Sequence, residues 1–268
     1  MAEPFASIAA IAEVTASVLD ATADLNEASW STPTSCPGWD VRDQLSHLIG
    51  FERMLMGEQA PEVEFNREHL RNPIGEINEP WIEARRPLPG AQVRDELAEV
   101  ALARVQALAS MSPADFEVVG WSPIGDVPYS VFMQVRVMDM WVHEQDIREV
   151  VGRPGGLGGA GERGALAKLL PSLGRAMVKG AGAPEGASLA LELTGSVPSR
   201  TVLEVVGGRA QAAEVSTPTA TLRMDSLTYT RLACGRRSGA DAIAAGLVAV
   251  EGDVDFATAV AGSMNAMI

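Results

Sequence analysis

Residues 36–48 read Cys-Pro-Gly-Trp-Asp-Val-Arg-Asp-Gln-Leu-Ser-His-Leu, and residues 139–146 read Asp-Met-Trp-Val-His-Glu-Gln-Asp. Each stretch places a histidine, His47 or His143, in the interior of a predicted helix. Asp139 precedes His143 by four residues, so their side chains project from one helix face, one turn apart. The two stretches therefore predict a pair of helices that carry two histidines and an aspartate.

Helical spacing of apolar residues predicts four long helices, over residues 5–28, 40–57, 92–111 and 129–151. Asp40 is the expected N-cap of the second helix, and Asp43 is expected to complete a capping box. Four such helices form an antiparallel bundle. Residues 60–91 contain five prolines, and we expect a loop there that is functional or carries short helical pieces. His69 lies in this loop and is expected to be exposed, with the alternative that the loop covers the pocket.

The periodicity of the sequence changes after the glycine-rich stretch 152–161, which we interpret as a domain junction. A helix is expected over residues 162–178. Period-two alternation then predicts strands over residues 188–194, 199–206, 211–215 and 220–224. Short helices are expected over residues 225–234, 239–245 and 255–266. The chain is thus predicted to hold a helical domain, residues 1–155, and a small α+β domain, residues 156–268.

Composition narrows the range of partners. The net charge of −14 argues against nucleic acid, because an acidic surface repels polyanions. A small anion remains possible, since a metal ion or a few arginines can reverse the field inside a pocket. No stretch approaches the roughly 20 apolar residues of a membrane span, the N-terminus lacks the features of a secretory signal, and two cysteines are too few for a disulfide framework. We expect a cytoplasmic monomer or homodimer that binds neither nucleic acid nor a membrane.

Two imidazoles and a carboxylate suit a divalent metal ion. Three protein ligands leave at least one position open, which is typical of catalytic rather than structural sites. The set suits zinc, and also iron, nickel or manganese. Asp146, on the same helix face as His143, is expected to orient an imidazole. Spacing alone leaves open that these are ordinary core or surface residues, because an aspartate four residues before a histidine is common on helices.

The stretch from Cys36 to Leu48 resembles the opening signature of the mycothiol-dependent maleylpyruvate isomerase family, within the DinB-like four-helix metalloproteins. The run Val-His-Glu-Gln-Asp-Ile-Arg at residues 142–148 resembles that family's second metal motif, Glu-x3-His-x2-Asp. The two motifs occur in the expected order, and the resemblance covers about residues 5–155. It implies a DinB-like antiparallel four-helix bundle for the N-terminal domain.

The resemblance also implies that His47, Asp139 and His143 bind zinc or another divalent ion. The family has glutamate where this chain has Asp139. Aspartate is shorter by one methylene, so either the helix approaches more closely or the carboxylate binds through water.

Residues 232–239 and 246–253 resemble the sterol-carrier-protein-like domain that accompanies these enzymes. An arginine of that domain reaches the active site in the mycothiol-dependent isomerase, and Arg236 is the matching position here, with Arg237 as the neighbour that could take the role. Such an arginine would hold a substrate carboxylate. The alternative is that both arginines cap a helix or face solvent.

The function implied by the resemblance is activation of a small-molecule thiol, mycothiol, by the bound metal. The thiolate would add to a small electrophilic or carboxylate substrate, and either cis–trans isomerisation or S-transfer would follow. Two other hypotheses stay open from the residues. One is a non-catalytic protein that binds an apolar or acyl ligand in its C-terminal domain, and the other is a metal-dependent hydrolase.

Overall fold

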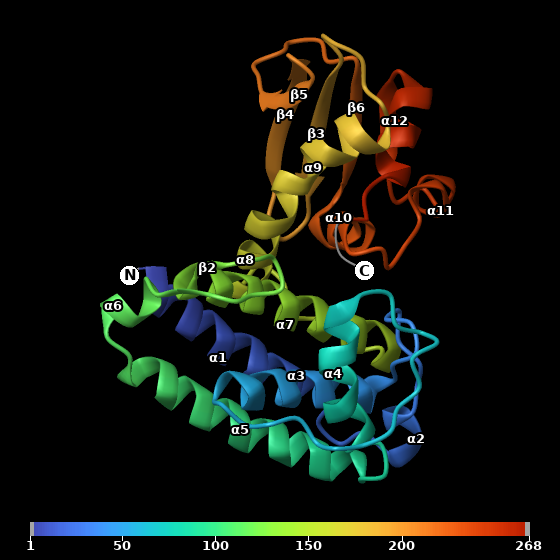
Figure 1. The fold of residues 1–268 in the computed structure, drawn as a ribbon. Helices are drawn as coiled ribbons and strands as arrows, with labels where there is room; N and C mark the ends of the chain where they lie inside the picture. Colours follow the sequence, from blue (N-terminus) through green and yellow to red (C-terminus); the bar gives the residue numbers. More distant parts are fainter. Residues whose placement is uncertain (1–2, 266–268) are drawn as a thin grey trace. The chain divides into compact units, whose positions relative to one another are not determined.

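The computed structural model describes residues 3–265 and divides into two compact units, residues 1–164 and 165–268. The first unit is helical and the second is built around a β-sheet (Figure 1). The prediction of a helical domain followed by an α+β domain is confirmed.

The division between the two units falls later than the predicted boundary after residue 155. Residues 156–164 group with the helical unit because the start of α8 (Ala160–Leu169) packs against it. A Cβ atom at Gly161 would lie 2.6 Å from Val14 and 2.8 Å from Trp141, so glycine allows this close approach. The glycine-rich stretch therefore belongs to the packing of the first unit.

The helical unit holds α1 (Glu3–Ala21), α2 (Glu27–Trp30), α3 (Val41–Leu55), α4 (Pro73–Glu83), α5 (Gly90–Ser110), α6 (Pro113–Phe116) and α7 (Tyr129–Val151), with strands β1 (Val119–Gly120) and β2 (Val127–Pro128). The four predicted helices correspond to α1, α3, α5 and α7. The first ends earlier than expected, because the chain turns at Asp24, whose φ is 56°, and restarts at α2.

The predicted loop over residues 60–91 contains α4. The Asn72 side chain caps this helix by accepting from the backbone N–H groups of Ile74 and Gly75, at 2.9 and 3.2 Å. Pro73 occupies the first turn, where its missing N–H costs no helical hydrogen bond. The prolines thus mark an irregular connection that carries a helix of its own, which is one of the two expected alternatives.

The four long helices run in two pairs. α3 and α7 run in opposite directions, because His47 faces Asp139 while Glu52, further along α3, faces Arg136, earlier on α7. α1 and α7 run side by side in the same direction (Figure 1). The long connection over residues 56–89 returns the chain, so α5 follows the direction of α3. α1 and α7 therefore run in one direction and α3 and α5 in the other. The bundle is antiparallel between these two pairs and parallel within each.

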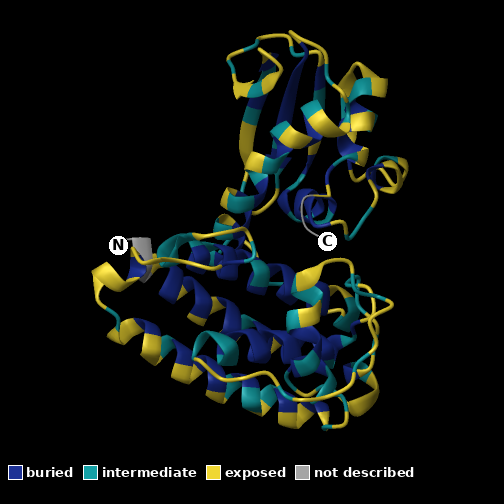
Figure 2. Cartoon of the chain, viewed as in Figure 1, coloured by how far each residue is buried: buried dark blue, intermediate teal, exposed yellow. Residues whose placement is uncertain are grey.

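α3 is the most enclosed helix of the bundle. Every residue from 43 to 52 is buried, including the polar or charged side chains of Asp43, Gln44, His47 and Glu52. The predicted capping box at its start is confirmed, with Asp43 N–H donating to Asp40 at 2.9 Å and Asp40 N–H donating to Asp43 at 3.3 Å. Figure 2 shows this buried interior along the bundle helices. Buried polar groups generally need hydrogen-bond partners, and Glu52 has its partners on α5 and α7.

The second unit contains a five-stranded sheet in the order β5-β4-β3-β6-β7. The strands are β3 (Ser188–Thr194), β4 (Ser199–Val206), β5 (Arg209–Ala212), β6 (Ala220–Asp225) and β7 (Ala249–Gly252). β3 and β6 are parallel, and the other neighbours are antiparallel. β7 was not predicted, because this short edge strand is mostly exposed and shows no apolar alternation.

Short helices accompany the sheet: η1 (Leu170–Ser172), α9 (Leu173–Arg175), η2 (Ala176–Gly180), α10 (Ser226–Ala233), α11 (Gly239–Ala244) and α12 (Val254–Gly262). The helix expected over residues 162–178 is interrupted near Pro171, which cannot donate a helical hydrogen bond. Residue 266, the last of the helix expected over 255–266, lies outside the described residues. Across residues 3–265, no helix has both the length and the apolar character needed to cross a bilayer.

Candidate metal centre

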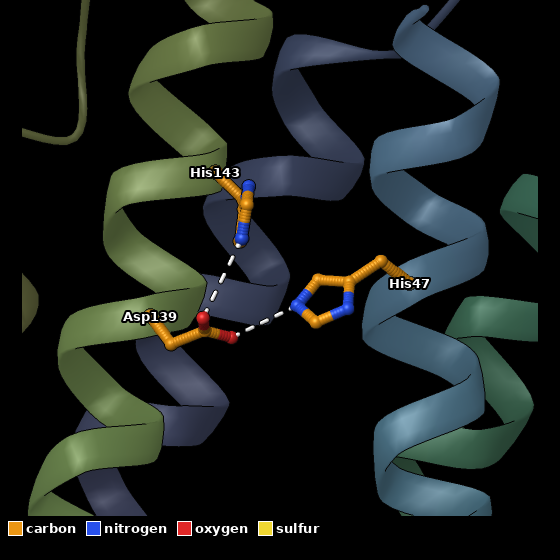
Figure 3. A group of neighbouring side chains, drawn as sticks. All are labelled: His47, Asp139 and His143. Carbon is orange, nitrogen blue, oxygen red and sulfur yellow. Dashed lines mark hydrogen bonds and ion pairs between the residues drawn. The ribbon is translucent and has the colours of Figure 1, made fainter. Parts of the chain in front are cut away.

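His47, Asp139 and His143 come together between α3 and α7 (Figure 3). His47 projects from the enclosed middle of α3 and is 2% exposed. Asp139 and His143 project from the facing side of α7, one turn apart, as their spacing predicts. The structure therefore brings together the three residues proposed as ligands from the sequence.

The donor atoms of the three side chains lie within 4.8 Å of one another. Nε2 of His47 lies 3.0 Å from Oδ2 of Asp139, and Nε2 of His143 lies 3.5 Å from Oδ1. Ligands bound at zinc distances in a tetrahedron are separated by roughly 3.3 Å. The two distances, one to each oxygen of Asp139, are close to this value, so the carboxylate lies within reach of both histidines.

Two members of the cluster, His47 and Asp139, have the protonation state that a cation requires. Burial lowers the pKa of His47 to about 4, so this imidazole is neutral near pH 7. Burial alone would raise the pKa of Asp139, but its interactions with His47, Arg136 and His143 outweigh burial and hold the pKa well below its ordinary value. A neutral imidazole and an ionised carboxylate are the forms that bind a metal.

His143 is held from two sides. Burial lowers its pKa, but Asp139 and Asp146 outweigh burial, and the net pKa is raised. Oδ2 of Asp146 lies 3.6 Å from Nδ1 of His143, on the ring edge opposite Asp139. Metal-bound histidines usually have a carboxylate or carbonyl at this second nitrogen. Asp146 is therefore the carboxylate nearest to this nitrogen on α7, at an ion-pair distance rather than a hydrogen-bond distance.

The residues present fit a divalent ion. Two imidazoles and a carboxylate form a ligand set that zinc and several transition metals accept. Nδ1 of His47 is buried without a hydrogen-bond partner. In a neutral imidazole one nitrogen carries the proton and the other carries a lone pair. Nε2 therefore offers its lone pair to the cluster when Nδ1 carries the proton. Binding of an ion at Nε2 would offset part of the cost of burying this ring.

Trp39 forms one wall of the site. Its ring centroid lies 5.1 Å from that of His47 and 5.7 Å from that of His143. Its indole N–H donates to the buried carboxylate of Glu79 at 3.3 Å. The indole therefore shields both imidazoles from solvent while its own polar atom is satisfied.

His69, the third histidine, was expected to be exposed, and this expectation is wrong. Its side chain is 18% exposed, and its Nε2 lies 3.2 Å from Glu79, the carboxylate that also accepts from Trp39. The ring lies against Gly38, where a Cβ atom would be only 2.7 Å away. The connection after α3 thus folds back over Trp39, a contact for which the sequence carries no periodic signal.

A set of buried charges beside the cluster was not predicted from the sequence. Arg136 donates to Oδ2 of Asp139 at 2.5 Å and to Glu52 at 2.8 and 3.0 Å. Arg104 donates to the other oxygen of Glu52 at 2.8 Å. A signal was present in part, because Arg136 lies one turn before Asp139 on α7. The partner Glu52 comes from another helix and could not be found by spacing.

Arg236 and Arg237 lie in the second unit, directly after α10. The turn is a Schellman motif, with Gly235 at φ 65° and the N–H groups of Gly235 and Arg236 donating to carbonyls of the last helical turn. The Arg236 guanidinium donates to the carbonyl of Cys234 at 3.1 Å. Both arginines are half-buried, and their role in substrate binding stays a prediction.

Comparison with known proteins identifies the family. The family model described as the mycothiol maleylpyruvate isomerase N-terminal domain matches residues 11–148, more than half of the chain and including all three proposed ligands. No curated protein matches the chain.

Two solved structures share the fold. A crystal structure of a histidine-to-alanine mutant of the mycothiol-dependent maleylpyruvate isomerase is 16% identical, with a TM-score of 0.56 over 92% of this chain and 93% of that chain. A crystal structure of the mycothiol-dependent maleylpyruvate isomerase is 18% identical, with a TM-score of 0.50 over 86% of this chain and 88% of that chain. The similarity of fold extends through both units, and the family match covers the helical one. The chain belongs to the mycothiol maleylpyruvate isomerase N-terminal domain family.

Proposed function

We propose that this protein is a metal-dependent enzyme that activates mycothiol for attack on a small electrophilic substrate. The observation that carries the proposal is the convergence of His47, Asp139 and His143, with their donor atoms within 4.8 Å, in a chain of this family. The family is one of enzymes named for a thiol-dependent isomerisation. The cluster supplies the protein side of such a reaction.

Each of the three residues would supply one ligand to the ion. His47, neutral and enclosed by α3 and Trp39, offers a nitrogen lone pair. Asp139 offers an ionised carboxylate, and His143 offers Nε2 while its Nδ1 lies 3.6 Å from Asp146. A divalent ion at such a site lowers the pKa of a coordinating thiol, so the thiol loses its proton at neutral pH. Three protein ligands leave room for that thiol.

The thiol is expected to come from a cosubstrate. Among the described residues, the cluster of possible metal ligands contains no cysteine. The family is named for mycothiol, and both similar structures are of a mycothiol-dependent enzyme. Mycothiol is therefore the cosubstrate that we propose.

The reaction follows from the chemistry of a thiolate. Its sulfur forms a bond to one carbon of an activated double bond, whose π electrons move to the activating carbonyl. Rotation about the resulting single bond and expulsion of the thiolate restore the double bond in the trans form. Retention of the sulfur, with a proton added to the neighbouring carbon, gives an S-conjugate instead. Arg236, or Arg237 beside it, is proposed to bind a substrate carboxylate through its planar guanidinium.

The test is turnover of maleylpyruvate and of a panel of small electrophiles by zinc-loaded protein, with and without mycothiol. We expect isomerised product or an S-conjugate only when the thiol is present, and at least a roughly 100-fold loss in the His47→Ala variant if the ligand set is correct. Turnover without thiol would support hydrolysis instead. Ligand binding that His47→Ala leaves intact, without any turnover, would support a binding protein.

A further inference from the structure

A line of alternating buried charges leads away from Asp139 into the bundle. It runs from Asp139 on α7 to Arg136 on the same helix, then to Glu52 on α3 and Arg104 on α5. Glu52, Arg104 and Arg136 are each 3% exposed or less. The line thus connects three helices of the bundle and ends on a proposed metal ligand.

Burying these charges is costly, even when they are paired. Apolar residues of similar volume often stabilise a protein as well or better, so a buried ion pair is weak evidence for a stabilising role. The line carries two positive and two negative groups, so each internal charge is compensated. The line of charges ends on Asp139, the proposed ligand. This position therefore points to a role other than stability.

Arg136 is held in place by contacts other than the one with Asp139. Its Nε and Nη2 both donate to one oxygen of Glu52, at 3.0 and 2.8 Å, and its guanidinium lies over the Phe51 ring, 4.2 Å from the centroid. The remaining nitrogen, Nη1, donates to Oδ2 of Asp139 at 2.5 Å. A planar guanidinium held on one side by Glu52 and on one face by Phe51 offers Nη1 at a defined place.

The Asp139 carboxylate is oriented by that contact. With Oδ2 bound by Arg136 and lying 3.0 Å from His47, the other oxygen, Oδ1, lies 3.5 Å from His143. One carboxylate therefore faces both histidines at once. The short side chain of aspartate has few rotamers, so fixing one oxygen fixes the other.

We propose that Arg136 is a positioning residue for the Asp139 carboxylate, and that Glu52 in turn orients Arg136. This inference rests on the proposed metal site. On this inference the buried charges help to set the metal affinity, which accounts for their position next to Asp139. Loss of an outer partner of a metal ligand typically weakens metal binding about 10- to 100-fold.

Arg104 provides a matched control. It is nearly as buried as Arg136 and donates to the same carboxylate, Glu52, at 2.8 Å. Its second terminal nitrogen, Nη2, is directed at Tyr129 and Met133 rather than at Asp139. Arg136→Met and Arg104→Met therefore both leave Glu52 with one arginine fewer. Only the first removes the donor to Asp139.

The experiment measures zinc affinity by competition with a chromophoric chelator, together with urea unfolding of the zinc-free protein. We expect both methionine variants to unfold at lower urea concentration. Zinc affinity should fall about 10- to 100-fold in Arg136→Met and change less than about threefold in Arg104→Met. If either variant does not fold, Arg136→Lys and Arg104→Lys are compared in its place. The same contrast is expected, because an ammonium group cannot bind Glu52 and Asp139 with the fixed geometry of a guanidinium.

Equal loss of zinc affinity at positions 136 and 104 would show that the charges act only through the stability of the fold, and would overturn the inference. Unchanged zinc affinity in the Arg136 variants would overturn it as well. Both outcomes leave the proposed function standing, because the native protein still binds zinc. Failure of the native protein to bind zinc is a separate result, and it overturns the proposed function itself.

Discussion

Asp139 shows how a single methylene can matter at a site between two helices. The family resemblance implies glutamate at this position, and we expected the shorter aspartate to need either a closer helix or a bridging water. In the structure, Oδ2 of Asp139 lies 3.0 Å from Nε2 of His47 on the facing helix, so the shorter side chain still reaches that histidine. Arg136, one turn earlier on α7, donates to the same oxygen and restricts rotation of the carboxylate.

Gly38 matters for the same site through its backbone. Its φ of 81° lies in the left-handed region, and a Cβ atom there would meet the His69 ring at 2.7 Å. We expect Gly38→Ala to lower the free energy of unfolding by about 1–3 kcal/mol, because it strains the backbone and displaces His69. Urea unfolding measures the change.

Gly57→Ala is the matched control for Gly38→Ala. Gly57 has a similar φ of 90°, but nothing lies within 4 Å of its Cβ position. This variant therefore carries the backbone strain alone and should lose less stability. Equal losses at the two positions would contradict the claim that His69 is packed against Gly38.

At the scale of elements, the start of α3 combines a helix cap with a buried ion pair. Asp43 completes the capping box, and its carboxylate also accepts from Arg86 at 3.2 Å. Burial, followed by the charge of Asp40, raises the pKa of Asp43 to about 6 in spite of Arg86. The folded protein thus holds a proton on Asp43 more tightly than the unfolded chain does.

The sign of the pH dependence follows from this raised pKa. The contribution of Asp43 to stability is fully present below its unfolded pKa near 4 and is lost as pH rises through about 6. We expect the free energy of unfolding, relative to Asp43→Asn, to fall by about 3 kcal/mol between about pH 4 and pH 7. Urea unfolding of both proteins over this range provides the measurement. A difference that stays constant or grows with pH would show that the Asp43 pKa is not raised.

The elements that could be predicted from the sequence are those with a strong local signal. The long helices, the capping box of α3 and the alternating strands β3, β4 and β6 were all expected from residues near one another in the chain. α4 and β7 were harder to predict. The first begins with a proline inside a proline-rich connection, and the second is a short, exposed edge strand whose pairing with β6 is not encoded by its own residues.

The candidate site likewise combines residues that the local sequence predicts with contacts that it does not predict. Asp139 and His143 could be paired from their spacing on one helix, and the motif around His47 pointed to the facing helix. The contacts of His69 with Glu79 and of Arg136 with Glu52 join elements that no local pattern relates. Their roles therefore became visible only when the helices were placed side by side.

At the scale of the whole molecule, the chain combines a helical unit that carries the proposed ligands with a sheet unit that carries Arg236. The two units are each compact, and the family match falls on the first. The net charge of −14 leaves the whole protein acidic, so binding of a thiolate or a carboxylate requires local positive charge. A divalent ion held by two neutral imidazoles and one carboxylate would supply it.

We propose that one divalent ion per chain is held by His47, Asp139 and His143. Elemental analysis of purified protein, after dialysis against zinc and then against metal-free buffer, tests it directly. We expect about one zinc per chain in the native protein and in His69→Ala, whose histidine lies outside the ligand set, and almost none in His143→Ala. Native protein without bound metal, or His143→Ala with a full complement of zinc, would show that these three residues do not form the metal site.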